Sequence, residues 1–125
     1  MQLASLDAMK QPGDLILLAP TGSGKTLAFL LPVLERLLPE ITSTQALIIV
    51  PSRELALQIE QVFKTMSTGQ KITCCYGGHL RETEENNLLE APALIVGTAG
   101  RLADHIRRGK ISIDTIHTLV LDEFD

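Results

Sequence analysis

The chain has 125 residues, 45% of them hydrophobic and 21% charged, and its net charge at pH 7 is −4. This length allows one domain at most, and the hydrophobic content is that of an ordinary packed core. The acidic balance excludes a surface that grips nucleic acid by bulk positive charge, but it leaves room for a local phosphate-binding face. No apolar run reaches the roughly 18 residues of a membrane span, and the N-terminus lacks the apolar core of a signal peptide. We therefore expect a cytoplasmic protein without membrane attachment.

The first half of the chain alternates between apolar runs and helical patterns. Residues 15–19 form a short apolar run between Pro-Gly-Asp and Pro-Thr-Gly, which is typical of a buried strand. Residues 25–38 have the spacing of a helix, which Pro32 can kink. A second buried strand is expected at residues 46–50. Ser52 is a preferred N-cap residue and predicts the start of the next helix.

The second half repeats this alternation. We expect a third strand at residues 71–76, a polar helix at 80–90, a fourth strand at 93–96, a short helix at 98–108 and a fifth strand at 118–121. Strands separated by helices predict a parallel sheet, and strands that are apolar throughout need helices on both faces. The sequence therefore predicts an α/β fold, a parallel sheet of about five strands, with functional residues at the carboxyl ends of the strands.

The cysteines and histidines indicate no special chemistry. Cys74 and Cys75 are adjacent, and one peptide unit brings two Cα atoms closer than a disulfide prefers. We predict two buried, reduced thiols, as in the cytosol. His79, His105 and His117 lack metal-ligand spacing, and we interpret them as surface or ordinary polar residues.

A phosphate loop follows the first expected strand. The P-loop pattern is Gly, four residues, then Gly-Lys-Thr, and here Ala19 stands at the first position while the rest matches. Glycines let backbone N–H groups surround phosphate oxygens, and the helix N-terminus adds partial positive charge. The lysine of this pattern reaches the outer phosphates and the threonine hydroxyl ligates Mg²⁺. The alternative is a simple Gly-rich turn. The residues of the predicted nucleotide site are Thr21, Gly22, Ser23, Gly24, Lys25 and Thr26.

Two acids end the last expected strand. The Asp122 carboxylate can hold Mg²⁺ opposite the Thr26 hydroxyl, through water. Glu123 can orient or deprotonate the attacking water. Two acids after a strand can also be a solvated turn, but the phosphate loop favours a catalytic pair. We therefore predict Lys25, Asp122 and Glu123 as the catalytic residues.

The motifs between these sites resemble those of the DEAD-box RNA helicases. Residues 51–56 read Pro-Ser-Arg-Glu-Leu-Ala and resemble the motif after the second strand of that family, and residues 77–78 match its glycine pair. Residues 98–101, Thr-Ala-Gly-Arg, resemble its Thr-Pro-Gly-Arg, and residues 122–125, Asp-Glu-Phe-Asp, resemble its Asp-Glu-Ala-Asp. Gln2 precedes Lys25 at the separation of the family's adenine-recognising glutamine. The resemblance covers essentially the whole chain.

This resemblance implies a partial RecA-like ATP-binding domain over residues 1–125, which would need ATP and Mg²⁺. In the family, such a domain works with a second RecA-like domain to couple ATP hydrolysis to RNA unwinding. Gln2 would bind the adenine edge, and Asp125 would couple the two domains. RNA would be held by its backbone, with little sequence readout. The residues implied to line the RNA face are Pro51, Arg53, Gly77, Gly78, Thr98 and Arg101.

Several of these residues have structural alternatives. Arg53 can pair with a nearby glutamate, the glycine pair can be only a turn, and Arg101 can cap a helix or pair on the surface. Gln2 lacks the aromatic element that precedes the family's glutamine. Ser52, Ala99 and Phe124 depart from the family's Thr, Pro and Ala; Ala99 would loosen the backbone before its helix, and Phe124 would alter the coupling.

The family's next motif, Ser-Ala-Thr, belongs to a strand between the P-loop strand and the Asp-Glu strand. Because the sequence ends at Asp125, we expect a gap there, with unpaired N–H and C=O groups. We also expect the isolated chain not to unwind RNA. Two other functions remain open: a P-loop helicase that acts on DNA, and a non-catalytic nucleotide-binding module.

Overall fold

The computed structural model describes residues 16–19, 25–66 and 69–122, and for residues 16–19, 25–29 and 122 it describes the backbone only. Strands and helices alternate along these segments, as expected. The strands are β1 (Ile16–Ala19), β2 (Ala46–Val50), β3 (Ile72–Cys75), β4 (Leu94–Thr98) and β5 (Thr118–Asp122). The helices are α2 (Lys25–Arg36), α3 (Arg53–Thr65), α4 (Arg81–Leu88) and α5 (Ala99–Arg107).

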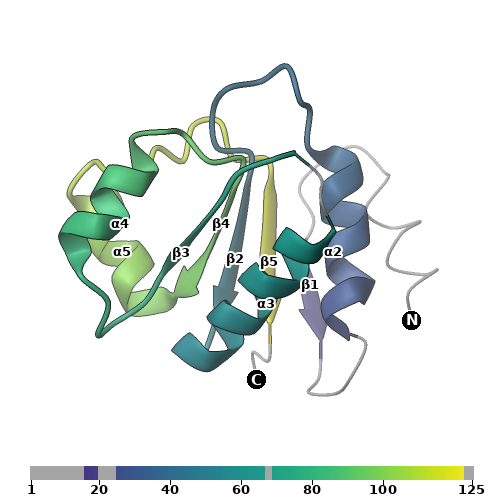
Figure 1. Ribbon diagram of the computed structural model, residues 1–125, viewed down its shortest axis with the longest axis horizontal. Helices are drawn as coiled ribbons and strands as arrows, with labels where there is room; N and C mark the ends of the chain where they lie inside the picture. The colour runs from purple at the N-terminus through teal and green to yellow at the C-terminus, as the bar shows by residue number, and fades with distance from the viewer. Residues whose placement is uncertain (1–15, 20–24, 67–68, 123–125) are drawn as a thin grey trace.

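The five strands form one parallel sheet in the order β1-β5-β2-β4-β3. Helices α2 and α3 cover one face of this sheet and α4 and α5 cover the other (Figure 1). The side chains of β2 and β4 divide between the two hydrophobic cores by alternation: Ile48 and Val96 face α2 and α3, whereas Leu47 and Ile95 face α4 and α5. The predicted α/β fold with helices on both faces is confirmed.

The element boundaries also agree with the sequence patterns. Ser52 is the N-cap of α3, and its hydroxyl accepts a hydrogen bond from the Leu55 N–H at 3.3 Å. Helix α2 continues through Pro32 as far as Arg36. Cys74 and Cys75 are both free and buried, as predicted. None of the helices in the described segments is long and apolar enough to cross a membrane.

The expected gap in the sheet is absent. Strand β1 pairs directly with β5 in parallel, from Ile16 opposite Leu119 to Ala19 opposite Asp122. The expectation of a missing strand between these two was therefore wrong for this chain. Direct pairing satisfies the backbone N–H and C=O groups that an open gap would leave without partners.

A buried glutamine joins the elements at the opposite edge of the sheet. Gln45 is completely buried; its side-chain oxygen accepts from the Leu38 N–H at 2.9 Å, and its amide donates to the Leu38 carbonyl at 3.0 Å. Its backbone carbonyl accepts from the N–H groups of His117 and Thr118, which enter β5. Gln45 thus ties the segment after α2 to the starts of β2 and β5.

Candidate functional site

The carboxyl ends of the parallel strands meet at one edge of the sheet, where the predicted motifs gather. At the β1 side, Ala19 is the last strand residue before the phosphate loop, and it lies in register with Asp122 at the end of β5. Helix α2 begins at Lys25, directly after the loop. The backbone therefore places the start of the phosphate loop next to the metal-binding candidate. Their separation is that of neighbouring strands, about 5 Å.

Several predicted nucleotide residues lie outside the described segments, namely Gln2, Thr21, Gly22, Ser23, Gly24, Glu123 and Asp125. For Lys25, Thr26 and Asp122 the backbone alone is placed, in α2 and β5. Two described positions are those that the predicted nucleotide site requires. Helix α2 begins at Lys25, and the strand-end acid Asp122 lies opposite Ala19.

The predicted RNA residues follow three neighbouring strands. Val50 of β2 is in register with Thr98 of β4, so β2 and β4 end at the same level, with Thr98 at the end of its strand and Pro51 directly after Val50. Cys75 of β3 is in register with Gly97, which places the turn containing Gly77 and Gly78 just beyond the same edge. The structure therefore brings together motifs that are separated by more than 20 residues in the sequence.

Arg53 and Gly78 lie side by side at this edge. Gly78 has a φ of +90°, and a Cβ atom built on it would lie 3.3 Å from Arg53 Nη1. The Arg53 side chain is 59% exposed, and its Nε donates to Glu54 Oε1 at 3.3 Å. The glutamate's own backbone N–H and Arg53 lower the pKa of Glu54. The pairing with a nearby glutamate is thus observed, but it is exposed and leaves the guanidinium open to a ligand.

Thr98 and the residues after it form the start of α5. Thr98 is the N-cap residue, with φ −82° and ψ 149°, and within the described segments its side chain makes no capping hydrogen bond. A Cβ atom built on Gly100 in the first turn would meet nothing within 4 Å. The backbone at this helix start is therefore accessible. Ala99 stands where the family has proline, and it is still the first residue of helix α5.

Arg101 points inward from the same turn. Its side chain is 13% exposed; Nη1 donates to Glu84 Oε1 at 3.1 Å and Nη2 donates to the His79 carbonyl at 3.2 Å. Arg101 therefore links α5 to the turn after β3 and to α4. The sequence left two structural alternatives for Arg101, capping a helix or pairing on the surface. The structure shows an ion pair with Glu84, and this pair is nearly buried.

Glu84 of α4 is the centre of this arrangement. It is completely buried, and its carboxylate accepts hydrogen bonds from four groups. Oε2 accepts from the Tyr76 N–H at 2.9 Å and from His79 Nδ1 at 2.8 Å. Oε1 accepts from Arg101 Nη1 and from His105 Nε2, the latter at 2.7 Å. We call these five residues, Tyr76, His79, Glu84, Arg101 and His105, the Glu84 cluster.

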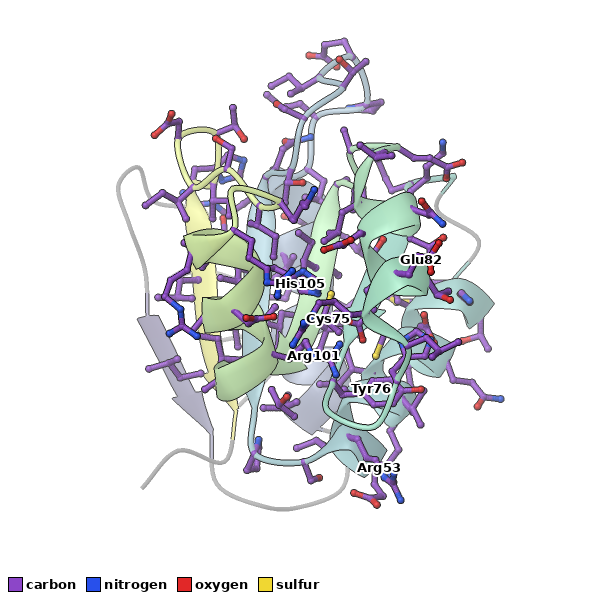
Figure 2. The ribbon with its side chains drawn as sticks, turned by 90° about the vertical axis from the view of Figure 1, so that its left-hand side faces the viewer. Arg53, Cys75, Tyr76, Glu82, Arg101 and His105 are labelled. Carbon is purple, nitrogen blue, oxygen red and sulfur yellow. The ribbon has the colours of Figure 1, made fainter. Side chains whose placement is uncertain are left out.

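The interpretation of His105 as a surface or ordinary polar residue was wrong. His105 is completely buried in α5, and its Nδ1 has no hydrogen-bond partner among the residues that the structure describes. His79 stacks on Tyr76 with ring centroids 4.8 Å apart. Figure 2 shows Cys75, Arg101 and His105 close together between α5 and α4, with Arg53 further toward the carboxyl edge of the sheet.

Sequence reasoning missed Glu84 because it treated the helix after the glycine pair only as a polar helix and assigned no buried face to it. One signal was available. Glu84 lies four residues before Leu88, the buried apolar residue of α4, so both side chains lie on the inward face. An acid on the buried stripe of a helix needs partners.

Three side chains of this region lie close enough together to hold a metal ion, but their chemistry argues against a metal site. Cys75, Glu84 and His105 are buried and offer ligand atoms within 4.8 Å of one another. Both Glu84 oxygens already accept hydrogen bonds. Burial, followed by the Glu84 charge, raises the pKa of the Cys75 thiol, whereas metals bind the thiolate. We interpret the region as a hydrogen-bonded charge cluster.

Comparison with known proteins identifies the family. The sequence profile described as DEAD/DEAH box helicase matches residues 1–125. The chain belongs to this family. It is 38% identical over 128 residues to the ATP-dependent RNA helicase DeaD of Buchnera aphidicola subsp. Baizongia pistaciae, covering 100% of this chain and 21% of the relative.

Two further relatives give the same result. The ATP-dependent RNA helicase DeaD of Escherichia coli (strain K12) is 41% identical over 115 residues, which are 90% of this chain and 18% of the relative. The DEAD-box ATP-dependent RNA helicase CshA of Geobacillus kaustophilus is 39% identical over 127 residues, which are 100% of this chain and 27% of the relative. The chain thus spans about a fifth to a quarter of the length of these helicases.

Proposed function

We propose that the protein is the ATP-binding part of an ATP-dependent RNA helicase, acting in the cytoplasm, which couples ATP hydrolysis to the unwinding or remodelling of RNA. The register of the sheet carries this proposal. Ala19, the strand residue before the phosphate-loop sequence, lies opposite Asp122, and Val50, the residue before Pro51, lies opposite Thr98 along the same edge. The family membership and the names of the relatives, ATP-dependent RNA helicases, support the choice of ATP and RNA.

The nucleotide would lie at the β1–β5 end of this edge. Backbone N–H groups of residues 21–26 would surround the phosphates, and Lys25 would neutralise the outer ones. Thr26 and Asp122 would hold Mg²⁺, which screens the phosphate charge during transfer. Glu123 would orient the attacking water, and Gln2 would bind adenine. Asp125 would pass the change in nucleotide state to a second RecA-like domain.

RNA would lie at the β2–β4–β3 end. Arg53 offers an exposed guanidinium to a phosphate, and the turn at Gly77 and Gly78 lets the RNA backbone approach closely. The uncapped start of α5 adds N–H groups for another phosphate. These are contacts to sugar and phosphate, so we expect little sequence specificity. We expect unwinding itself to require the second domain.

Binding of labelled nucleic acids separates this proposal from its alternatives. With Mg²⁺ and a non-hydrolysable ATP analogue present, we expect tighter binding of single-stranded RNA than of duplex DNA of equal length. The Arg53→Ala variant should weaken RNA binding about tenfold, as expected for one charged hydrogen bond. Equal binding of duplex DNA would favour a DNA-acting helicase. Nucleotide binding without any nucleic-acid binding would favour a non-catalytic nucleotide-binding module.

A further inference from the structure

We propose that Glu84 is a positioning residue for the RNA face, which holds the glycine turn and the start of α5 at a fixed spacing. This inference rests on the proposed function, because it concerns the face to which RNA would bind. Glu84 itself is completely buried and would touch no RNA. It would act through the groups that it binds.

The four bonds of Glu84 come from two separate parts of the face. Tyr76 and His79 flank the glycine pair, and Arg101 and His105 belong to α5. Arg101 closes the arrangement because its second nitrogen donates to the His79 carbonyl at 3.2 Å. The turn and the helix start are therefore joined both through the carboxylate and directly. A shift of either part would break at least one charge-assisted hydrogen bond.

The cluster needs a carboxylate at position 84. Every polar neighbour is a donor: a backbone N–H, a guanidinium, and two imidazole nitrogens that must carry hydrogen to bond an ionised carboxylate. A glutamine has one acceptor oxygen and one NH₂ group. If its oxygen faces Tyr76, its NH₂ opposes Arg101, and if its oxygen faces Arg101, its NH₂ opposes the Tyr76 N–H. The Glu84→Gln variant therefore loses one side of the cluster in either orientation.

Helix α4 offers a matched control. Glu82 is exposed on the same helix (Figure 2), and Glu82→Gln changes the net charge by the same amount. A general gain in RNA affinity from removing one negative charge is thus expected in both variants. A lower RNA affinity of Glu84→Gln than of Glu82→Gln therefore reflects the loss of the buried hydrogen bonds of Glu84.

Two measurements test the proposal. The first is the NMR signals of the Arg101 guanidinium and the His105 Nε2–H. We expect resolved, slowly exchanging signals in the wild-type chain and in Glu82→Gln, and averaged or missing Arg101 signals in Glu84→Gln. The second is the affinity for labelled single-stranded RNA. We expect about tenfold weaker binding for Glu84→Gln than for Glu82→Gln, which corresponds to one lost charged contact.

The outcomes separate this inference from the proposed function. Unchanged Arg101 signals in Glu84→Gln, or equal RNA affinities of the two glutamine variants, would overturn the positioning role. A wild-type chain without RNA affinity would contradict the proposed function, and the Arg101 signals would still decide whether Glu84 holds the turn. If Glu84→Gln does not fold, Arg101→Lys replaces it. Lysine keeps the charge but cannot bridge Glu84 and the His79 carbonyl with two nitrogens, so RNA affinity should again fall.

Discussion

Ala19 and Asp122, the last residues of β1 and β5, lie opposite each other in a parallel pair. The phosphate loop leaves the sheet after Ala19, and helix α2 begins at Lys25. The strand-end acid is therefore next to the start of the loop, where a metal ion bound to phosphates would need an oxygen ligand.

Replacing Asp122 should weaken the effect of Mg²⁺ on nucleotide binding. In the Asp122→Asn variant, we expect the Mg²⁺ concentration needed for half-maximal ATP binding to rise at least tenfold, because an amide is a poorer ligand for a hard cation. Titration of Mg²⁺ against a fluorescent ATP analogue measures this. Asp114→Asn is the control, since Asp114 is exposed in the loop before β5. An unchanged Mg²⁺ dependence of Asp122→Asn would exclude the metal role.

Gly78 should not tolerate a side chain. Its φ of +90° is unfavourable for alanine, and the added Cβ would lie 3.3 Å from Arg53 Nη1. We expect Gly78→Ala to lower the free energy of unfolding by about 1–2 kcal/mol in urea denaturation. Gly77→Ala is the matched control, because its φ is not positive and its Cβ would meet nothing within 4 Å. Equal stability of the two variants would contradict the described turn.

Ala99→Pro should stabilise the chain. Ala99 is the first residue of α5, where proline is favoured, and Thr98 before it has the extended conformation that proline requires, with ψ 149°. We expect the free energy of unfolding to rise by about 0.5–1 kcal/mol, because proline restricts the unfolded chain. Urea denaturation measures the change. A loss of stability would mean that the start of α5 differs from the one described.

The organisation of the chain could be predicted from local patterns because strands and helices depend on short-range signals. Ser52 capped its helix as expected, and the apolar residues 46–50 formed β2. The Glu84 cluster could not be predicted in this way. Its members come from the turn after β3, from α4 and from α5, and only tertiary packing brings His105 to Glu84. The expected gap beside β1 was wrong because it assumed the strand order of a longer domain.

The buried thiols make stability sensitive to alkaline pH. Burial raises the pKa of Cys74 from 9.0 to about 12, with Glu60 and Glu84 as smaller causes. The folded state therefore favours the protonated thiol. The contribution of the protonated Cys74 thiol to the free energy of unfolding is fully present below about pH 9, where the thiol of the unfolded chain titrates. It is lost as the pH rises toward 12.

Cys74→Ala isolates this effect. Between pH 9 and 11, the free energy of unfolding of the wild-type chain should fall more steeply than that of Cys74→Ala, by up to about 1.4 kcal/mol per pH unit. Urea denaturation at several pH values measures both slopes. Parallel slopes would show that the Cys74 thiol is not protected from deprotonation.

Binding of a fluorescent ATP analogue, with and without Mg²⁺, tests the central claim most directly. The account predicts Mg²⁺-dependent binding by the wild-type chain and a loss of at least tenfold in affinity for Lys25→Ala, because the lysine neutralises the outer phosphates. Lys110→Ala serves as the control, since Lys110 follows the end of α5, whereas the start of α5 lies at the carboxyl end of β4. A folded wild-type chain that binds no nucleotide, or binds it equally well after Lys25→Ala, would contradict the assignment of an ATP site to this edge of the sheet.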